Sequence, residues 1–166
     1  MIGKYFFLLL LSINKLNNEK LDSIHYFLSY SLFAYTRMPP EADSGDKCYH
    51  YTELLMVKFN KKSKVSELRF SDSAPDWLIK DFEKTKLLGR VKVDKLDSIA
   101  KKNNIRNIVI LFPVIIEPDS FPCGESKRAR KLPANYFCFN NQLLNESVII
   151  GKQIEIIWPS AYHKKN

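Results

Sequence analysis

Glycine is scarce in this sequence, at 5 of 166 residues, and neither GxxxxGK nor GxGxxG occurs. These motifs cradle phosphates in nucleotide-binding proteins, so their absence argues against both kinds of nucleotide site. Cysteine is also rare. Cys48, Cys123 and Cys138 form no CxxC pair, which argues against structural zinc, and their odd number cannot close a disulfide framework. We expect free buried thiols; the alternative is a Cys123–Cys138 bridge in an oxidising compartment.

Metal-binding patterns are missing as well. The three histidines are His25, His50 and His163, and the nearest approach to a ligand pair is Cys48-x-His50. A site built on that pair would need distant ligands that the sequence does not identify. We therefore expect no metal and no cofactor.

The residues around the first predicted helix offer no catalytic arrangement. Ser71 and Ser73 have neither a glycine elbow nor a nearby base, so a serine nucleophile is unsupported. Asp72, Asp76 and Asp81 crowd the same region. We assign the first two to the N-terminus of a helix, where exposed amides and the helix dipole favour negative charge. The sequence carries no catalytic motif, and we expect a protein that is not an enzyme.

What the sequence does contain is apolar material and positive charge. Hydrophobic residues make up 45% of the chain and aromatic residues 13%, which is enough for a substantial core. The 26 Lys and Arg residues exceed the 18 Asp and Glu residues, so the formal net charge is +8. This surplus favours anionic partners such as nucleic acid, anionic lipid or acidic proteins. The simpler interpretation is a solubilising surface.

The N-terminal region has two apolar runs. Residues 5–13 (YFFLLLLSI) follow Lys4 as in a secretory signal, but no clean A-x-A site follows and nine residues are too few to span a bilayer. Residues 24–35 (IHYFLSYSLFAY) form the second run. Residues 1–13 can be a signal peptide, residues 1–36 can be two helices on a membrane or on the domain, or both runs can be core helices of a cytoplasmic protein. We favour export or membrane attachment in the cell envelope, with the cytoplasm as the alternative.

Composition divides the chain into four parts. Residues 1–36 form the apolar signal-like or anchoring helical segment, and residues 37–47 (RMPPEADSGDK) form a linker rich in proline and small residues. Residues 48–160 form the folded domain, and residues 161–166 form a polar tail.

The first half of the domain shows strand and then helix periodicity. Residues 51–59 and 65–70 alternate apolar and polar side chains around a short polar turn, which predicts a β-hairpin. Residues 71–86 predict a helix, with Ser73 as N-cap and Asp76 completing a capping box. A second, short helix is expected from Asp94, as its cap, to Lys102, with Asn103-Asn104 as its stop.

The second half contains strands around an irregular segment. Residues 108–116 (IVILFPVII) predict a strand buried on both faces, in which Pro113 requires either a bulge or a change to an edge strand. Residues 117–135 are irregular, and residues 136–139 are a short apolar patch. Residues 148–150 and 153–158 flank Gly151-Lys152, which predicts a second hairpin with a type II′ turn.

The order of these elements predicts the fold class. Pairs of strands separated by helices indicate an α+β fold: an antiparallel or mixed sheet of about four to five strands with two helices packed on one face, plus an N-terminal helical segment.

Two stretches resemble a known family. Residues 57–78 (VKFNKKSKVSELRFSDSAPDWL) and residues 151–159 (GKQIEIIWP) are similar in pattern to the C-terminal domain of TonB-like proteins. That domain has a strand, a turn, a second strand, a Ser-containing junction, a helix with a buried Leu, and a closing strand after a Gly-Lys turn. The chain has Lys62-Ser63 where the family usually has Gly, and it lacks the long Pro/Lys-rich spacer of an energy transducer. The resemblance implies a TonB-C-like fold in an envelope-located binding module.

One basic cluster is the candidate contact site for an anion or a partner. The cluster, KRARK, contains Lys127, Arg128, Arg130 and Lys131, and Tyr136, Phe137 and Phe139 follow it closely. Basic groups beside aromatic rings can bind phosphate and stack bases. We expect a non-enzymatic binding protein of the cell envelope that uses a sheet edge and the 117–135 loop to bind another protein or an envelope component. The alternative is a cytoplasmic nucleic-acid-binding protein that uses residues 127–131.

Overall fold

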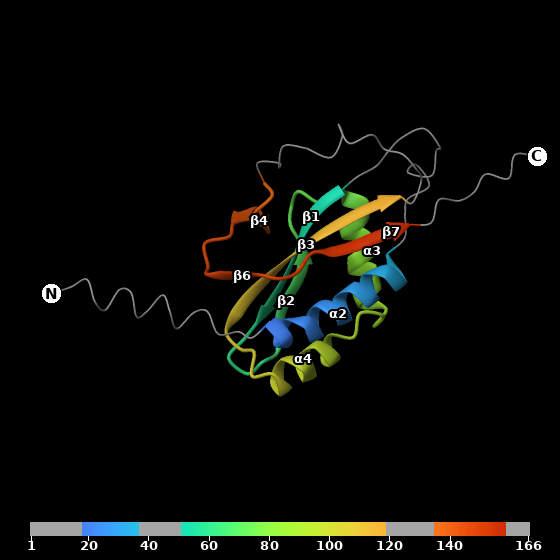
Figure 1. The fold of residues 1–166 in the computed structure, drawn as a ribbon. Coiled ribbons are helices and arrows are strands. Elements are labelled where there is room, and N and C mark those ends of the chain that lie inside the picture. Colours follow the sequence, from blue (N-terminus) through green and yellow to red (C-terminus); the bar gives the residue numbers. More distant parts are fainter. Residues whose placement is uncertain (1–17, 37–50, 119–134, 159–166) are drawn as a thin grey trace, which may run out of the picture.

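The computed structural model describes residues 18–36, 51–118 and 135–158, and these residues form the expected α+β fold (Figure 1). Within them, three helices cover one face of a five-stranded mixed sheet, and a two-stranded hairpin packs on the other face. The elements in chain order are α2 (Asn18–Tyr35), β1 (Tyr51–Phe59), β2 (Val65–Phe70), α3 (Asp76–Leu87), α4 (Val93–Lys102), β3 (Ile108–Pro118), β4 (Cys138–Phe139), β5 (Gln142–Leu143), β6 (Val148–Ile150) and β7 (Ile154–Trp158).

The sheet combines antiparallel and parallel pairing. β1 pairs antiparallel with β2, as the first predicted hairpin requires, and also with β3. The prediction that β6 and β7 form a hairpin is wrong, because both strands pair in parallel with β3. A type II′ turn would need a positive φ at Gly151, but among the described glycines the positive φ is at Gly89. Gly151 instead packs closely against the ring of Phe112.

β3 is buried on both faces, as expected, and Pro113 marks an irregularity beside it. The register pairs Leu111 with Ile150 of β6 and Val114 with Ile154 of β7. Between these pairs β3 advances by three positions and the β6–β7 segment by four, so the segment has one extra residue. The Gly151 N–H donates to the Leu111 carbonyl at 2.8 Å. Backbone groups of successive residues point to opposite sides of a strand, so position 113 also faces β6 and β7. The irregularity therefore lies opposite the residue that has no N–H to donate.

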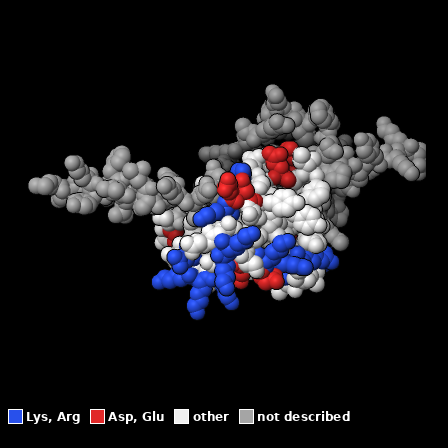
Figure 2. Space-filling view, turned by 60° about the horizontal axis from the view of Figure 1, so that its bottom comes forward, with Lys and Arg blue, Asp and Glu red and all other residues white. Residues whose placement is uncertain are grey.

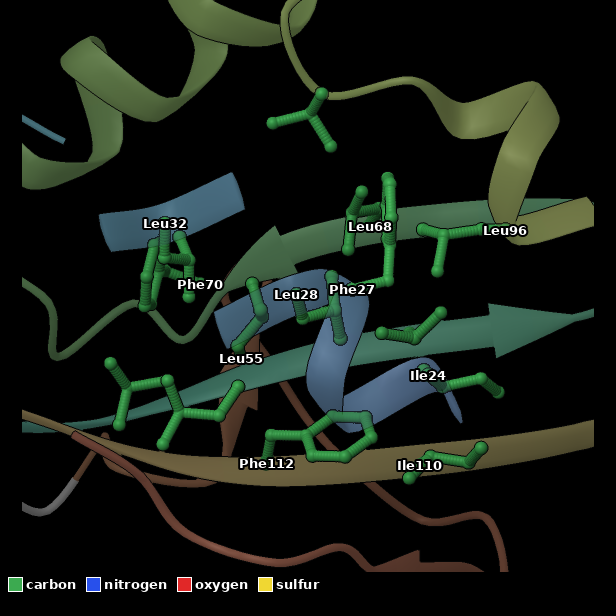
Figure 3. Close-up of a cluster of buried hydrophobic side chains, with 14 of the residues drawn as sticks. Ile24, Phe27, Leu28, Leu32, Leu55, Leu68, Phe70, Leu96, Ile110 and Phe112 are labelled. Carbon is green, nitrogen blue, oxygen red and sulfur yellow. The ribbon is translucent and has the colours of Figure 1, made fainter. Parts of the chain in front are cut away.

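The two faces of the sheet have separate apolar clusters. On the helix side, Leu55, Ile110 and Phe112 share a cluster with side chains from α2 and α4 (Figure 3). Side chains from α3 belong to the same cluster. On the other side, Leu54 and Leu111 belong to a smaller cluster with Met56, Val109, Tyr136 and Phe139. Neighbouring residues of a strand face opposite sides, so β1 and β3 supply side chains to both clusters. The sequence predicted burial of both faces for β3 but of one face for β1, whose Leu54 and Met56 are also buried.

Helix α2 packs into the core of the domain. Its residues Leu21, Ile24, Leu28 and Leu32 are buried in the same cluster as the sheet. Residues 18–35 therefore share one core with residues 51–118, whereas residues 1–17 and the expected linker lie outside the described residues. No helix within residues 18–36, 51–118 and 135–158 combines the length and apolar character needed to cross a bilayer.

The predicted N-caps of the two helices are wrong, although both helices are confirmed and α4 ends at Lys102, before Asn103-Asn104, as expected. Helix α3 begins at Asp76 after Pro75, and α4 begins at Val93 after Lys92; neither N-cap position makes a side-chain cap hydrogen bond. Ser73 does not cap α3, because its hydroxyl donates to Glu53 at 2.9 Å. The capping-box spacing is local, but a buried carboxylate from another strand competes for the hydroxyl.

Candidate binding surfaces

The basic cluster predicted from the sequence lies outside the described residues. This applies to Lys127, Arg128, Arg130 and Lys131, and also to Cys48, His50, Cys123 and His163. The aromatic residues that follow the cluster are described. Tyr136 and Phe139 are buried against the sheet, and Phe137 is exposed. Two of the three rings are thus unavailable for stacking on a base. The thiol of Cys138 is free.

One edge of the sheet is covered by side chains. At β2, the Val65 N–H donates to the Asp97 carboxylate of α4 at 2.7 Å, and Lys86 of α3 donates to the Leu68 carbonyl at 2.7 Å. A strand edge whose backbone groups are satisfied by side chains is a poor template for another strand. The β2 edge is therefore closed to strand addition.

The opposite edge, at β7, has a different environment. His25 of α2 bonds to the Gln153 carbonyl at 2.8 Å, just before the strand begins. Ile154 and Ile156 are buried under α2, whereas Glu155 and Ile157 are exposed. Because position 113 of β3 faces β7, position 115 faces it too, and in a parallel ladder it bonds to the neighbours of its paired residue, Glu155. The N–H and C=O groups of Glu155 and Ile157 therefore point away from β3. Among the described residues, no side chain covers these groups as Asp97 and Lys86 cover those of β2.

Helix α2 carries aromatic side chains on the face opposite the core. Tyr26, Tyr30 and Phe33 are 75%, 62% and 58% exposed. Their spacing of four and three residues places them in one stripe along the helix. We call these three residues the aromatic stripe. The spacing of these three residues can be read from the sequence. Their exposure cannot, because the core and surface residues of this helix are equally apolar.

Basic side chains flank α2. The Lys95 ammonium lies 5.6 Å from the ring centroid of Phe27, and the Arg90 guanidinium lies 6.0 Å from that of Tyr35. Lys92 is exposed at the start of α4, between these two positions in the chain. Figure 2, which turns this side of the molecule toward the viewer, shows Lys and Arg side chains gathered over its lower part.

A second basic surface lies at the end of the molecule that holds the β1–β2 turn. The Asn107 N–H donates to the Asn60 carbonyl at 3.0 Å, which holds the α4–β3 connection against this turn. The exposed cations of the turn, of the last residues of α4 and of the connection are thereby brought together: Lys61, Lys62, Lys64, Lys101, Lys102 and Arg106. We call these six residues the basic end. The cations of the β1–β2 turn are far along the chain from those around the end of α4, so the sequence alone does not show that the two groups form one surface.

A buried polar cluster lies where β1 meets the β2–α3 junction. Glu53 is 6% exposed, and its carboxylate accepts the Ser73 hydroxyl, which lies 2.8 Å from the Ser71 hydroxyl. Burial raises the pKa of Glu53 above its ordinary value of 4.5, and the Ser73 hydrogen bond lowers it by less. Burial raises the pKa of Tyr136 as well, and the charge of Glu53 adds to this shift.

Glu53→Gln tests this cluster. A raised carboxyl pKa means that the native state binds its proton more tightly than the unfolded state does, so stability declines as the pH rises above about 4.5. We expect Glu53→Gln to raise the midpoint of thermal unfolding at pH 7 and to leave it nearly unchanged near pH 4. The exposed Glu155→Gln serves as the control, with no effect at either pH. A lower midpoint for Glu53→Gln at pH 7 would contradict the assignment.

Asp72 holds the β4–β5 hairpin against the β2–α3 junction by hydrogen bonds. Its carboxylate accepts the N–H groups of Asn140 and Asn141 at 3.1 and 2.7 Å, and its carbonyl accepts the Asn135 side chain. Asn140 and Asn141 both have positive φ, as the central residues of a type I′ turn do. The expectation that Asp72 serves the N-terminus of α3 is therefore wrong. Its carboxylate instead binds the exposed amides of a turn that is distant in sequence.

Comparisons with protein-family models, with curated proteins and with solved structures gave no match. The resemblance to TonB-like C-terminal domains rests on residues 57–78 and 151–159.

Proposed function

We propose that this protein is a non-enzymatic binding protein of the cell envelope that accepts an extended segment of a partner protein at the outer edge of β7. The observation that carries this proposal is the contrast between the two sheet edges. At β2, the Val65 N–H is bonded to Asp97 and the Leu68 carbonyl to Lys86. At β7, the outward groups of Glu155 and Ile157 meet no such cover among the described residues.

The side chains around β7 suit strand addition. An added strand gains affinity from main-chain hydrogen bonds and specificity from alternate side chains. Ile154 and Ile156 anchor β7 beneath α2, so the strand is held in place before a partner arrives. Ile157, at 45% exposure, offers an apolar contact on the opposite face, and Glu155 offers a negative charge on the same face. This chemistry favours a partner segment with an apolar and a basic side chain two residues apart.

Glu155→Pro tests the proposal, because proline removes an N–H that is not needed for pairing with β3. Glu155→Ala removes the same carboxylate and keeps the N–H, so it is the matched control. In cells that express the protein, a photo-crosslinking residue at Ile157 reports the partner. We expect Glu155→Pro to reduce the crosslinked partner by ~tenfold, and Glu155→Ala to retain most of it. Equal crosslinking by the two variants would refute strand addition at β7.

Nucleic-acid binding is a second candidate, and the basic end favours it. Its six cations come from two segments that meet at one end of the sheet, and such clusters bind phosphate backbones. This surface differs from the Lys127 to Lys131 cluster that the sequence suggested. An oligonucleotide arm in the experiment below separates this candidate from a lipid-binding one.

A further inference from the structure

We propose that the face formed by α2 and α4 binds the surface of an anionic lipid bilayer, with the aromatic stripe in the interfacial layer and the flanking cations on the lipid headgroups. This inference goes beyond strand addition at β7 and does not depend on it, because it uses different residues and a different kind of partner.

The first observation concerns the two sides of α2. Leu28, at 1% exposure, lies in the core, and Tyr30, at 62% exposure, lies on the opposite side of the same helix. A surface helix normally presents polar residues opposite its core face. Here Tyr26, Tyr30 and Phe33 occupy the middle of the outer face instead. Tyrosine is well suited to the boundary between water and lipid, where its apolar ring is buried and its hydroxyl stays hydrated, and Phe33 adds a fully apolar ring to the same face.

The second observation is the charge beside this stripe. Arg90 and Lys95 lie over Tyr35 and Phe27, toward the C-terminal end and the middle of α2, and Lys92 is exposed between them in the chain. Helix α4 packs against α2. Lys92 is the residue just before α4, and Lys95 lies in its first turn. Cations within a Debye length of an anionic membrane surface are attracted to it, and this attraction adds to the burial of aromatic rings.

The arrangement favours a bilayer over a second copy of the chain. In a two-fold dimer through this face, each set of cations would meet the identical face of the other copy, including its Arg90 and Lys95. Like charges brought together across an interface oppose association. An anionic bilayer offers an interfacial layer that can bury the rings and negatively charged headgroups that can bind the cations.

The test is co-sedimentation of the full chain with vesicles of phosphatidylcholine, with and without phosphatidylglycerol at roughly one third of the lipid. We expect binding to the anionic vesicles and about tenfold weaker binding to the neutral ones. The variant Tyr26→Ser with Tyr30→Ser and Phe33→Ser should bind the anionic vesicles at least about tenfold more weakly than the wild type. Leu143→Ser with Ile150→Ser removes exposed apolar side chains elsewhere and should bind as the wild type does.

The comparison of variants decides the outcome, because the apolar residues 5–13 can contribute to vesicle binding in every variant. Arg90→Gln with Lys95→Gln should weaken binding to the anionic vesicles, and Lys80→Gln with Lys84→Gln on α3 should not. Circular dichroism checks that each variant is folded. Equal vesicle binding by the stripe variant and its control overturns the proposal. The proposal is also overturned if an oligonucleotide releases all of the wild-type protein from the anionic vesicles and the stripe variant binds that oligonucleotide as tightly as the wild type does.

Discussion

Leu28→Ala is expected to lower the free energy of unfolding by about 2–5 kcal/mol, the usual cost of truncating a buried leucine. Leu28 is 1% exposed, and it packs in the cluster that joins α2 to the sheet. The loss combines the transfer free energy of the removed methyl groups with the cavity that they leave, because the neighbours in a two-sided core cannot collapse into it fully. Urea denaturation followed by circular dichroism measures the change.

Tyr30→Ala is the matched control, because it removes a larger side chain from the same helix two residues further on. Tyr30 is on the exposed side, so its removal should change the free energy of unfolding by no more than about 0.5 kcal/mol. A similar loss for both variants would show that α2 is not held to the sheet by one face. A negligible loss for both would show that α2 is dispensable for the fold.

Gly151→Ala is expected to cost about 1–3 kcal/mol of stability, through overpacking against Phe112. A Cβ at position 151 would lie closer to the Phe112 ring than van der Waals contact allows, and this ring is fully buried and packed under the helices. The ring cannot move aside easily, since the core around it is close-packed. Thermal and urea unfolding measure the loss.

Phe112→Leu should rescue Gly151→Ala in part, which distinguishes steric overlap from a turn requirement. The smaller side chain makes room for the methyl group, so the double variant should be more stable than the sum of the two single changes by about 1 kcal/mol. Gly89→Ala is the control. Gly89 has φ +64° and no atom within 4 Å of the added Cβ, so its cost comes from backbone conformation and Phe112→Leu should not reduce it. A coupling of zero between positions 112 and 151 would contradict the close-approach explanation.

The positions of the sheet and helix elements could be predicted because they depend on local patterns. The alternation in residues 51–59 and 65–70 and the short polar turn between them specify β1 and β2 without reference to the rest of the chain. The same holds for the helical spacing of Leu78 and Phe82 and for the apolar run of β3. Each pattern gives the type of its own element, and the α+β class follows from the order of elements. The second buried face of β1, with Leu54 and Met56, depends on the distant residues Tyr136 and Phe139 that cover it.

The candidate surfaces could not be predicted, because they depend on contacts between distant residues. Ser73 has capping spacing, but Glu53, 20 residues away, takes its hydroxyl. Asp72 stands before a helix, but it binds a turn 68 and 69 residues further on. The contrast between the β2 and β7 edges requires knowledge of which strand lies at each edge, and an apolar pattern does not specify that.

By itself, the sequence determined the three helices, the strands of the main sheet, the mixed composition of α2 and the absence of recognised catalytic motifs, because these depend on residues close together in the chain. It did not predict the β4–β5 hairpin. Only the tertiary structure decided that β6 and β7 run parallel to β3, and which aromatic residues of α2 face outward. The physical reason is that strand pairing and helix orientation minimise the exposed area of the whole core. Three residues such as Tyr26, Tyr30 and Phe33 are left outside when Leu21, Ile24, Leu28 and Leu32 on the other face of α2 bury more area against the sheet.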